Sequence, residues 1–215
     1  MKIIYIADFF LPTNKAYSIH VFQMLDAFGK LGLESKLLIP YFNKHKIRES
    51  IKFYGLLNKN KIQVYNIFKN KLKFNFITRI LFGIFVAYAA NKINSKKLVI
   101  TRSLSSSIFL SLFKIYHFLE VHQEIKGLSK FLLINLNFIN SKYVIKNIFI
   151  SKSLARFYKK KTRKFIVLHD GVNLERFKNK KKIKNVKKIS YIGSFYKGRG
   201  VKLIFEIAKI LKKFD

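Results

Sequence analysis

The sequence predicts an α/β fold in which helices flank a parallel sheet, followed by the first strand and helix of a second such unit. Short apolar strand patterns alternate with amphipathic helix patterns from the first residue, which is typical of parallel α/β proteins. Half of the 215 residues are apolar, enough for one good core and the start of a second. A basic run at 176–188 without helical or strand periodicity indicates an interdomain linker.

The first strand and helix form the clearest unit. Residues 2–7 are a nearly continuous apolar run, as expected for a buried parallel strand. A loop over 8–17 leads to a helix for which Ser18 is the predicted N-cap. The helix has one apolar face, made of Ile19, Phe22, Leu25 and Phe28. Gly32 lies where a left-handed helix cap is needed, ahead of a strand at 35–39.

The same alternation continues along the chain. Further strands are predicted at 62–67, 98–101, 116–120, 147–151 and 165–168, and helices at 76–93, 105–114, 126–140 and 152–160. We therefore predict a first domain over 1–175, the linker over 176–188, and the start of a second domain over 189–215. One strand and one helix cannot form a domain, so the chain is expected to be a fragment or to be completed by a partner.

The composition restricts the classes of function. There is no cysteine, which excludes disulfides, thiolate metal sites and a cysteine nucleophile, and favours a reducing, cytoplasmic location. Lys and Arg number 44 against 10 Asp and Glu, a net charge of +34. Such a field attracts nucleotides, anionic lipids or nucleic acid. A genome biased toward Lys, Asn and Ile would give the same composition, and RNA-binding signatures are missing, so no nucleic acid partner is expected.

The most hydrophobic stretch, at 76–90, raises the question of a membrane segment. It is shorter than the roughly 20 apolar residues that a spanning helix needs, and it contains Arg79. We expect a helix that covers the sheet, with a helix lying partly in the membrane interface as the alternative. Peripheral attachment to the inner face of the membrane is consistent with both the charge and this segment.

Glycines at 193–200 follow a predicted strand and open a predicted helix, which is a suitable place for a phosphate group. Glycine allows the backbone to approach an anion, and the helix start favours negative charge. Lys197 and Arg199 add formal charge, with Gly193 and Gly200 at the ends of the loop. The loop lacks the Lys-Ser/Thr of a nucleotide P-loop and has the wrong glycine spacing for a dinucleotide site. A plain glycine-rich turn is the alternative.

Five histidines are present, and no two have the His-Glu-x-x-His spacing of a zinc hydrolase, so we expect no metal and no resident cofactor. His122 follows a predicted strand, at the carboxyl edge of a parallel sheet where α/β proteins place their sites. Glu120 and Glu124 flank it, although closeness in sequence does not establish a catalytic pair. A surface or capping histidine is the alternative interpretation.

Six segments of the chain form an ordered set of motifs. They are P-T-N-K-A-Y-S-I-H-V at 12–21, V-I-T-R-S at 99–103, E-V-H at 120–122, I-F-I-S-K-S-L at 148–154, H-D-G-V-N-L-E-R-F at 169–177, and the Y-I-G to R-G-V segment at 191–201. In this order they resemble the family-four retaining glycosyltransferases of GT-B fold, along essentially the whole chain. The resemblance implies two Rossmann-like domains facing a cleft, with this chain supplying the amino-terminal, acceptor-side domain and the opening of the donor domain.

The resemblance also implies roles for particular residues. Ala16, Tyr17 and Ser18 would face the donor phosphates and the transferred sugar, and His122 would contact that sugar as the catalytic-site histidine. Arg199, with Lys197 nearby, would bind the diphosphate in the loop between Gly193 and Gly200. Ser194 stands where the family often has Arg, and the family's pair of glutamates spaced eight apart is not in this sequence.

Two functional hypotheses follow from these observations. The first is the amino-terminal portion of a transferase that moves a sugar from a nucleotide-sugar donor to a polysaccharide or glycolipid acceptor, inactive as this piece alone. Its partners would be the nucleotide sugar, a glycan or lipid-linked acceptor, and an anionic membrane surface. The second is a non-catalytic basic α/β module that binds anionic membrane or nucleic acid.

Overall fold

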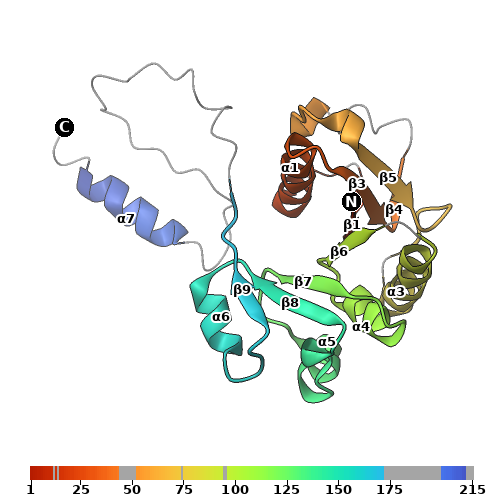
Figure 1. Cartoon of the computed structure of the whole chain (residues 1–215). Coiled ribbons are helices and arrows are strands. Elements are labelled where there is room, and N and C mark those ends of the chain that lie inside the picture. The colour runs from red at the N-terminus through yellow and green to blue at the C-terminus, as the bar shows by residue number, and fades with distance from the viewer. Residues whose placement is uncertain are drawn as a thin grey trace. The chain divides into compact units, whose positions relative to one another are not determined.

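A computed structural model describes residues 1–11, 13, 15–43, 52–73, 75–93, 96–171 and 200–211. The chain divides into two compact units, Met1–Asn173 and Leu174–Asp215 (Figure 1). The first unit contains a parallel sheet flanked by helices, which confirms the predicted α/β class. The described part of the second unit is Gly200 and helix α7 (Val201–Leu211). The predicted linker at 176–188 and the strand predicted just before Gly193 lie outside the described residues.

Seven parallel strands form the main sheet of the first unit. They are β1 (Lys2–Ile6), β3 (Glu34–Ile39), β5 (Ile62–Asn66), β6 (Lys97–Thr101), β7 (His117–Val121), β8 (Val144–Phe149) and β9 (Phe165–Val167). Their order is β5-β3-β1-β6-β7-β8-β9, so the chain builds outward from β1 on one side and then returns to build on the other. This order is Rossmann-like. The reversal between β1 and β6 creates a crevice at the carboxyl ends of these strands, the usual ligand position in such folds.

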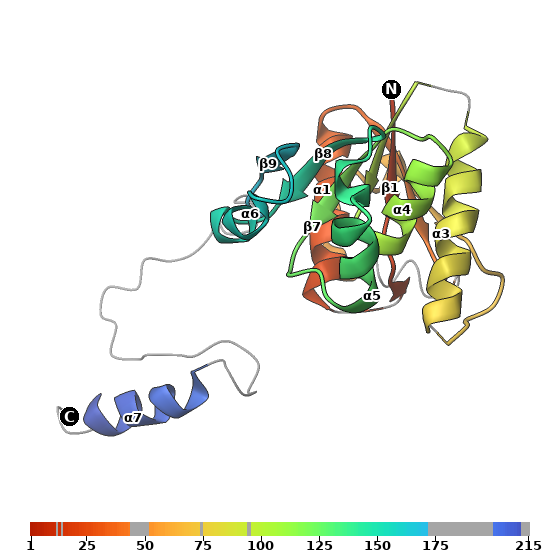
Figure 2. The same ribbon diagram turned by 90° about the horizontal axis from the view of Figure 1, so that it is seen from below.

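Helices cover both faces of the sheet, and β1 is therefore buried on both sides. Ile3 and Tyr5 pack in the same core as α1 (Ala16–Lys30), whereas Ile4 and Ile6 pack in the core of the opposite face, with α3 (Phe76–Asn91) and α4 (Leu104–Leu112) (Figure 2). All four of these strand residues have no exposed surface. A third core joins β7, β8 and α6 (Lys152–Tyr158). A separate parallel pair joins β2 (Phe10–Leu11) to β4 (Tyr41–Phe42).

The prediction that Ser18 is the N-cap of the first helix is wrong. α1 begins at Ala16, two residues earlier, and its N-cap Lys15 makes no side-chain cap bond. The Ser18 hydroxyl donates to the Lys15 carbonyl at 2.7 Å and accepts from the Tyr54 hydroxyl at 3.1 Å. Ser18 is therefore a buried residue of the first turn, where a serine bonds back to the preceding backbone.

The C-terminal end of α1 confirms the prediction for Gly32. Its φ of +76° is in the left-handed region, which glycine adopts without a steric cost. The Leu33 N–H donates to the Phe28 carbonyl at 3.0 Å, so the backbone closes the helix as it turns toward β3. This turn fixes the direction in which the second strand enters the sheet.

The prediction of one continuous helix at 126–140 is wrong. The segment comprises α5 (Gly127–Lys130), a π-helical turn η3 (Phe131–Asn135) and a 3₁₀ turn η4 (Phe138–Asn140). Asn137 lies between the last two with φ of 60°, which ends any right-handed helix. The apolar periodicity extends across these turns because Leu133 and Ile139 reach the same core.

α3 and α4 pack closely at Gly83. A Cβ at this position would lie 2.4 Å from the Phe109 ring, so only glycine permits the contact. The outer side of α3 exposes an apolar stripe made of Ile77, Leu81, Phe85 and Tyr88. Within the part of the chain that the structure describes, every helix is too short or too polar to cross a membrane.

Candidate functional site

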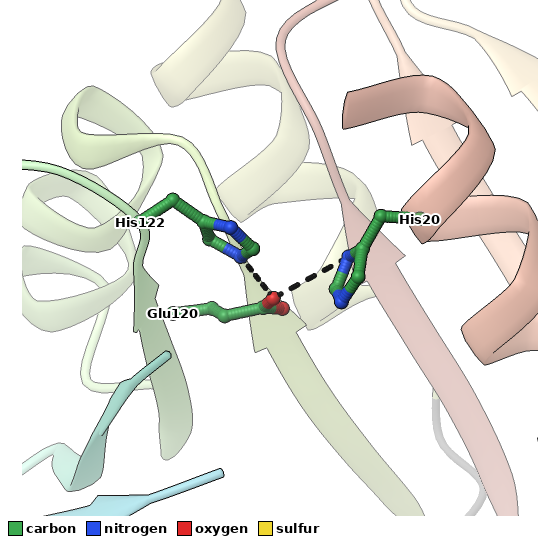
Figure 3. Close-up of side chains that lie close together, drawn as sticks. All are labelled: His20, Glu120 and His122. Atoms are coloured by element: carbon green, nitrogen blue, oxygen red, sulfur yellow. Dashed lines mark hydrogen bonds and ion pairs between the residues drawn. The ribbon is translucent and has the colours of Figure 1, made fainter. Parts of the chain in front are cut away.

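Tyr5, His20, Glu120 and His122 meet at the carboxyl edge of the sheet, in the region where the strand order reverses (Figure 3 shows His20, Glu120 and His122). Tyr5 comes from β1 and His20 from the second turn of α1. Glu120 lies on β7, and His122 follows the last residue of that strand. Side chains two residues apart on a strand point to the same face, so Glu120 and His122 are placed together by the local backbone.

Glu120 is the centre of this cluster. It is buried, with 4% of its surface exposed. The Tyr5 hydroxyl donates to Oε2 of Glu120, and Nε2–H of His122 donates to Oε1. Burial raises the pKa of Glu120, but these two hydrogen bonds and the adjacent His122 and His20 outweigh it, so the pKa lies below its ordinary value. The carboxylate is therefore ionised and acts only as an acceptor.

His20 connects this carboxylate to two further charged groups. Nη1 of Arg102 lies 3.4 Å from Nδ1 of His20 and donates to the Tyr17 carbonyl at 3.2 Å. A guanidinium only donates, so Nδ1 of His20 is the acceptor and Nε2 carries the proton. Nε2 of His20 lies 3.0 Å from Oδ1 of Asp170. Burial lowers the pKa of His20 more than Glu120 and Asp170 raise it, which favours this neutral ring.

A cavity of about 780 Å³ lies beside the cluster. Asp8, Arg102, Glu120 and His122 supply its polar side at the strand ends. Three helical segments supply most of the remaining walls. The residues are Phe76, Arg79 and Ile80 of α3, Leu104, Ser105, Ile108 and Phe109 of α4, and Leu128, Ser129 and Leu132 of α5 and η3. The volume suits a ligand of the size of a sugar or a larger organic molecule.

The residue types at the centre of the site also match those that bind transition metals. One ligand atom each from His20, Glu120 and His122 lies within 4.8 Å of the others. However, Nδ1 of His20, which lies 3.7 Å from Oε1 of Glu120, also lies 3.4 Å from the Arg102 guanidinium. A second cation there would be repelled, so we assign these atoms to the hydrogen-bond network rather than to a metal.

The structure brings together some of the residues predicted from the sequence. His122 and Tyr17 both line the cavity, while Ser18 is a buried residue of the first turn of α1 and Ala16 is exposed at the start of that helix. Gly200 belongs to the second unit, where its φ of +69° precedes α7. The predictions for Gly193, Lys197 and Arg199 lie outside the described residues.

Sequence reasoning missed most of the cluster. Tyr5 lies within the predicted buried strand at 2–7, and His20 and Arg102 lie within segments of the family resemblance without a predicted role. The two-residue spacing of Glu120 and His122 on one strand was the available signal for their pairing. Glu124, the other flanking carboxylate, lies 3.7 Å from Lys126 and does not join the cluster.

Comparisons with known proteins agree with the fold. No family model and no curated protein matches the sequence. Among solved structures, the chain is similar to a glycosyltransferase from Rickettsia africae ESF-5, with a TM-score of 0.55 and 14% sequence identity. The match covers 82% of this chain and 45% of that one, so this chain spans less than half the length of its structural neighbour. At this identity the likeness supports the Rossmann-like fold.

Proposed function

We propose that this chain is the acceptor-side domain of a glycosyltransferase of GT-B fold, of the retaining family-four type, followed by the start of its donor-binding domain. The observation behind the proposal is the cluster of His20, Glu120 and His122 beside a cavity at the switch point of a Rossmann-like sheet. The six ordered sequence segments and the glycosyltransferase neighbour give independent support. The division into 1–175, 176–188 and 189–215 belongs to this proposal.

The reaction would transfer a sugar from a nucleoside diphosphate to a glycan or lipid-linked hydroxyl. The bond between the anomeric carbon and the diphosphate oxygen breaks, and its electron pair leaves with the diphosphate. The acceptor oxygen bonds to the anomeric carbon, and its proton passes to the departing diphosphate. Such a reaction depends on positioning the two substrates and stabilising the charge of the leaving group.

Within this scheme, His122 contacts the transferred sugar from the cavity, and Glu120 fixes its ring by accepting from Nε2–H. Tyr17 faces the same space. Gly193, Lys197, Arg199 and Gly200 would bind the diphosphate through backbone amides and positive charge. On the acceptor side Ala16 is exposed at the start of α1 and would face the donor, whereas Ser18 is buried and would act only by holding the first turn of that helix. No resident metal or cofactor is part of this proposal.

The test compares the purified 215-residue protein with a completed protein that carries a related donor domain. We expect the completed protein to transfer sugar from one member of a panel of UDP- and GDP-sugars, and the isolated chain to transfer none. Transfer by the isolated chain would disprove its inactivity. A completed protein that binds UDP or GDP by calorimetry yet uses no donor would contradict the glycosyltransferase assignment itself.

Peripheral membrane attachment on the cytoplasmic side is the second part of the proposal. The stripe of Ile77, Leu81, Phe85 and Tyr88 on α3 would enter the interface, and the net charge of +34 would attract anionic lipids. Vesicle co-sedimentation should rise with anionic lipid and fall with salt. Phe85→Glu should weaken it, whereas Phe157→Glu on α6 should not. Equal binding to neutral vesicles would contradict this, and comparable RNA binding would favour the non-catalytic alternative.

A further inference from the structure

The cavity beside His122 has two chemically different parts. Its polar part lies at the strand ends, where Asp8, Arg102 and Glu120 are found. Its remaining walls come from the helices and are largely apolar, with Phe76 and Ile80 on α3 and Leu132 on η3 as examples. A ligand that fits both parts must have a polar head and an apolar tail.

Asp8 is the acidic group of the polar part that the histidine cluster does not use. It follows β1 by two residues, and its side chain is about one-third exposed, at 31%. Oδ2 of Asp8 lies 3.9 Å from Nη1 of Arg79, which comes from α3. The pair therefore spans from the sheet edge to the helical wall. The Asp8 carboxylate can accept a hydrogen bond from a ligand hydroxyl, and the Arg79 guanidinium can donate one to it.

The surroundings of Asp8 restrict its access to water. Burial raises its pKa to about 6, although Arg79 and Arg102 each lower it. Asp8 and Glu120 line the cavity together with Arg79 and Arg102, so the two carboxylates offset the two guanidinium groups. This balance of charge favours a neutral, hydroxylated head group over an anionic one.

The apolar walls continue outward to exposed residues. Phe76 and Leu128 line the cavity from α3 and α5 and are 57% and 49% exposed. Ile77, which follows Phe76 on α3, and Phe131, which begins η3 directly after α5, are 64% and 49% exposed. Apolar surface therefore extends from within the cavity to solvent, on two separate segments. A free sugar would leave this surface wet, whereas a hydrocarbon chain would cover it.

We propose that this cavity binds an amphiphilic acceptor, whose hydroxylated head lies at Asp8 and Arg79 and whose hydrocarbon chain lies along the wall that ends at Phe76 and Leu128. The inference rests on the proposed transferase function and specifies the substrate class of the same site. It selects a lipid-bearing acceptor over a soluble glycan.

The experiment uses the 215-residue protein and two probes with the same head group, octyl β-D-glucoside below its micellar concentration and methyl β-D-glucoside. Binding is measured by NMR titration. We expect octyl glucoside to bind at least about tenfold more tightly, a conservative figure when each buried CH₂ is worth about 0.8 kcal/mol. Asp8→Asn should weaken both glucosides about fivefold. Phe76→Ser should weaken octyl glucoside alone.

Phe157→Ser on α6 is the matched control. The exposed fraction of Phe157, 56%, is close to the 57% of Phe76, and Phe157 does not line the cavity. It should leave both affinities unchanged. Equal affinities for the two glucosides, or octyl glucoside binding that Phe76→Ser and Phe157→Ser reduce equally, would overturn the inference. Either result leaves the transferase proposal standing, because donor-dependent transfer by a completed protein tests that proposal separately.

Discussion

His117 and His122 lie at opposite ends of the same strand and have opposite surroundings. His117 begins β7 and is fully buried. Its Nδ1–H donates to the Ile115 carbonyl at 2.9 Å, and its Nε2 accepts from the Ser107 hydroxyl at 2.8 Å. His122 follows the other end of the strand, pairs with the ionised Glu120, and lines the cavity. The ring of His117 makes its hydrogen bonds to neutral groups, whereas the ring of His122 donates to a charged carboxylate.

The difference teaches where this fold can place chemistry. At the amino end of β7, the loop and α4 close over the ring, and burial lowers the pKa of His117 to about 4. At the carboxyl end, three strand ends and the start of α1 contribute Tyr5, Arg102, Glu120 and His20 to one space. A histidine at the first end stabilises the fold, and a histidine at the second can act on a ligand. The following experiments test this distinction.

The largest expected effect is the pH dependence that His117 gives to folding. Its pKa of about 4 in the folded state lies below the ordinary 6.5, so the unfolded chain binds the proton more readily. The stability that the folded protein gains from a neutral His117 is fully present above pH 6.5 and is lost as the pH falls toward 4. Between pH 7 and pH 4.5, we expect the wild type to lose about 2–3 kcal/mol more unfolding free energy than His117→Gln.

Urea unfolding at both pH values measures this difference. His169→Gln is the control, because His169 is exposed whereas His117 is fully buried. Equal pH dependence in the wild type and His117→Gln would show that His117 is not held neutral by burial, and the contrast with His122 would weaken.

The second largest effect is expected on catalytic activity, when His122 is replaced in a completed protein. His122→Ala should lower turnover about 100-fold and leave UDP or GDP affinity within about twofold, if its contact with the sugar acts mainly in the transition state. Arg199→Ala should lower both nucleotide affinity and turnover, because its charge would bind the diphosphate throughout the reaction. Calorimetry and a transfer assay separate the two. Full activity in His122→Ala would make His122 a surface histidine like any other.

The same contrast explains which parts of the molecule the sequence predicts. The parallel α/β class and the order of most elements follow from apolar periodicity, because β1 is buried on both faces and each helix has an apolar side. Gly32 was predictable because a left-handed residue closes α1 before β3. Ser18 was not, because its hydroxyl bonds back to Lys15 and meets Tyr54 from a distant segment.

Prediction of the site was limited by its tertiary origin. His122 could be selected because one strand pattern ends just before it. Tyr5, His20 and Arg102 reach the same space from three other elements, and their contacts with Glu120 and with one another depend on strand order. Local sequence gives the end of each strand, but not which strands are neighbours in the sheet.

A smaller effect is expected from Glu120, which we place as a positioning residue for His122. Glu120→Gln keeps the shape but loses the charge that orders Nε2–H of His122 and the Tyr5 hydroxyl. In a completed protein, kcat should fall about tenfold with little change in KM for the donor. Tyr5→Phe, which removes one donor to Glu120, should cost less.

A purely structural role for Glu120 would not change the tautomer of His122, so ¹⁵N NMR of the imidazole gives an independent measurement. The wild type should carry the proton on Nε2, and Glu120→Gln should show a mixture of tautomers. A loss of activity with an unchanged tautomer would assign the effect to something other than ring orientation.

Asp8 gives the smallest effect and extends the comparison to the rest of the carboxyl edge. Its pKa of about 6 lies above the ordinary 3.8, mainly because it is removed from water, while Arg79 and Arg102 act in the opposite direction. The folded state therefore binds this proton more readily, and the stability that it contributes at acid pH is lost as the pH rises through 6. Since the side chain remains 31% exposed, we expect the charged Asp8 to lower the free energy of unfolding at pH 8 by about 1–2 kcal/mol rather than by the full value of the shift.

Asp8→Asn should thus stabilise the protein at pH 8 and not at pH 4. The control is Glu34→Gln, at an exposed carboxylate, which should change the stability little at either pH. An Asp8→Asn variant that is destabilised at pH 8 would show that its charge stabilises the fold. Asp8 would then resemble a structural ion pair with Arg79 more than a group kept for binding a ligand.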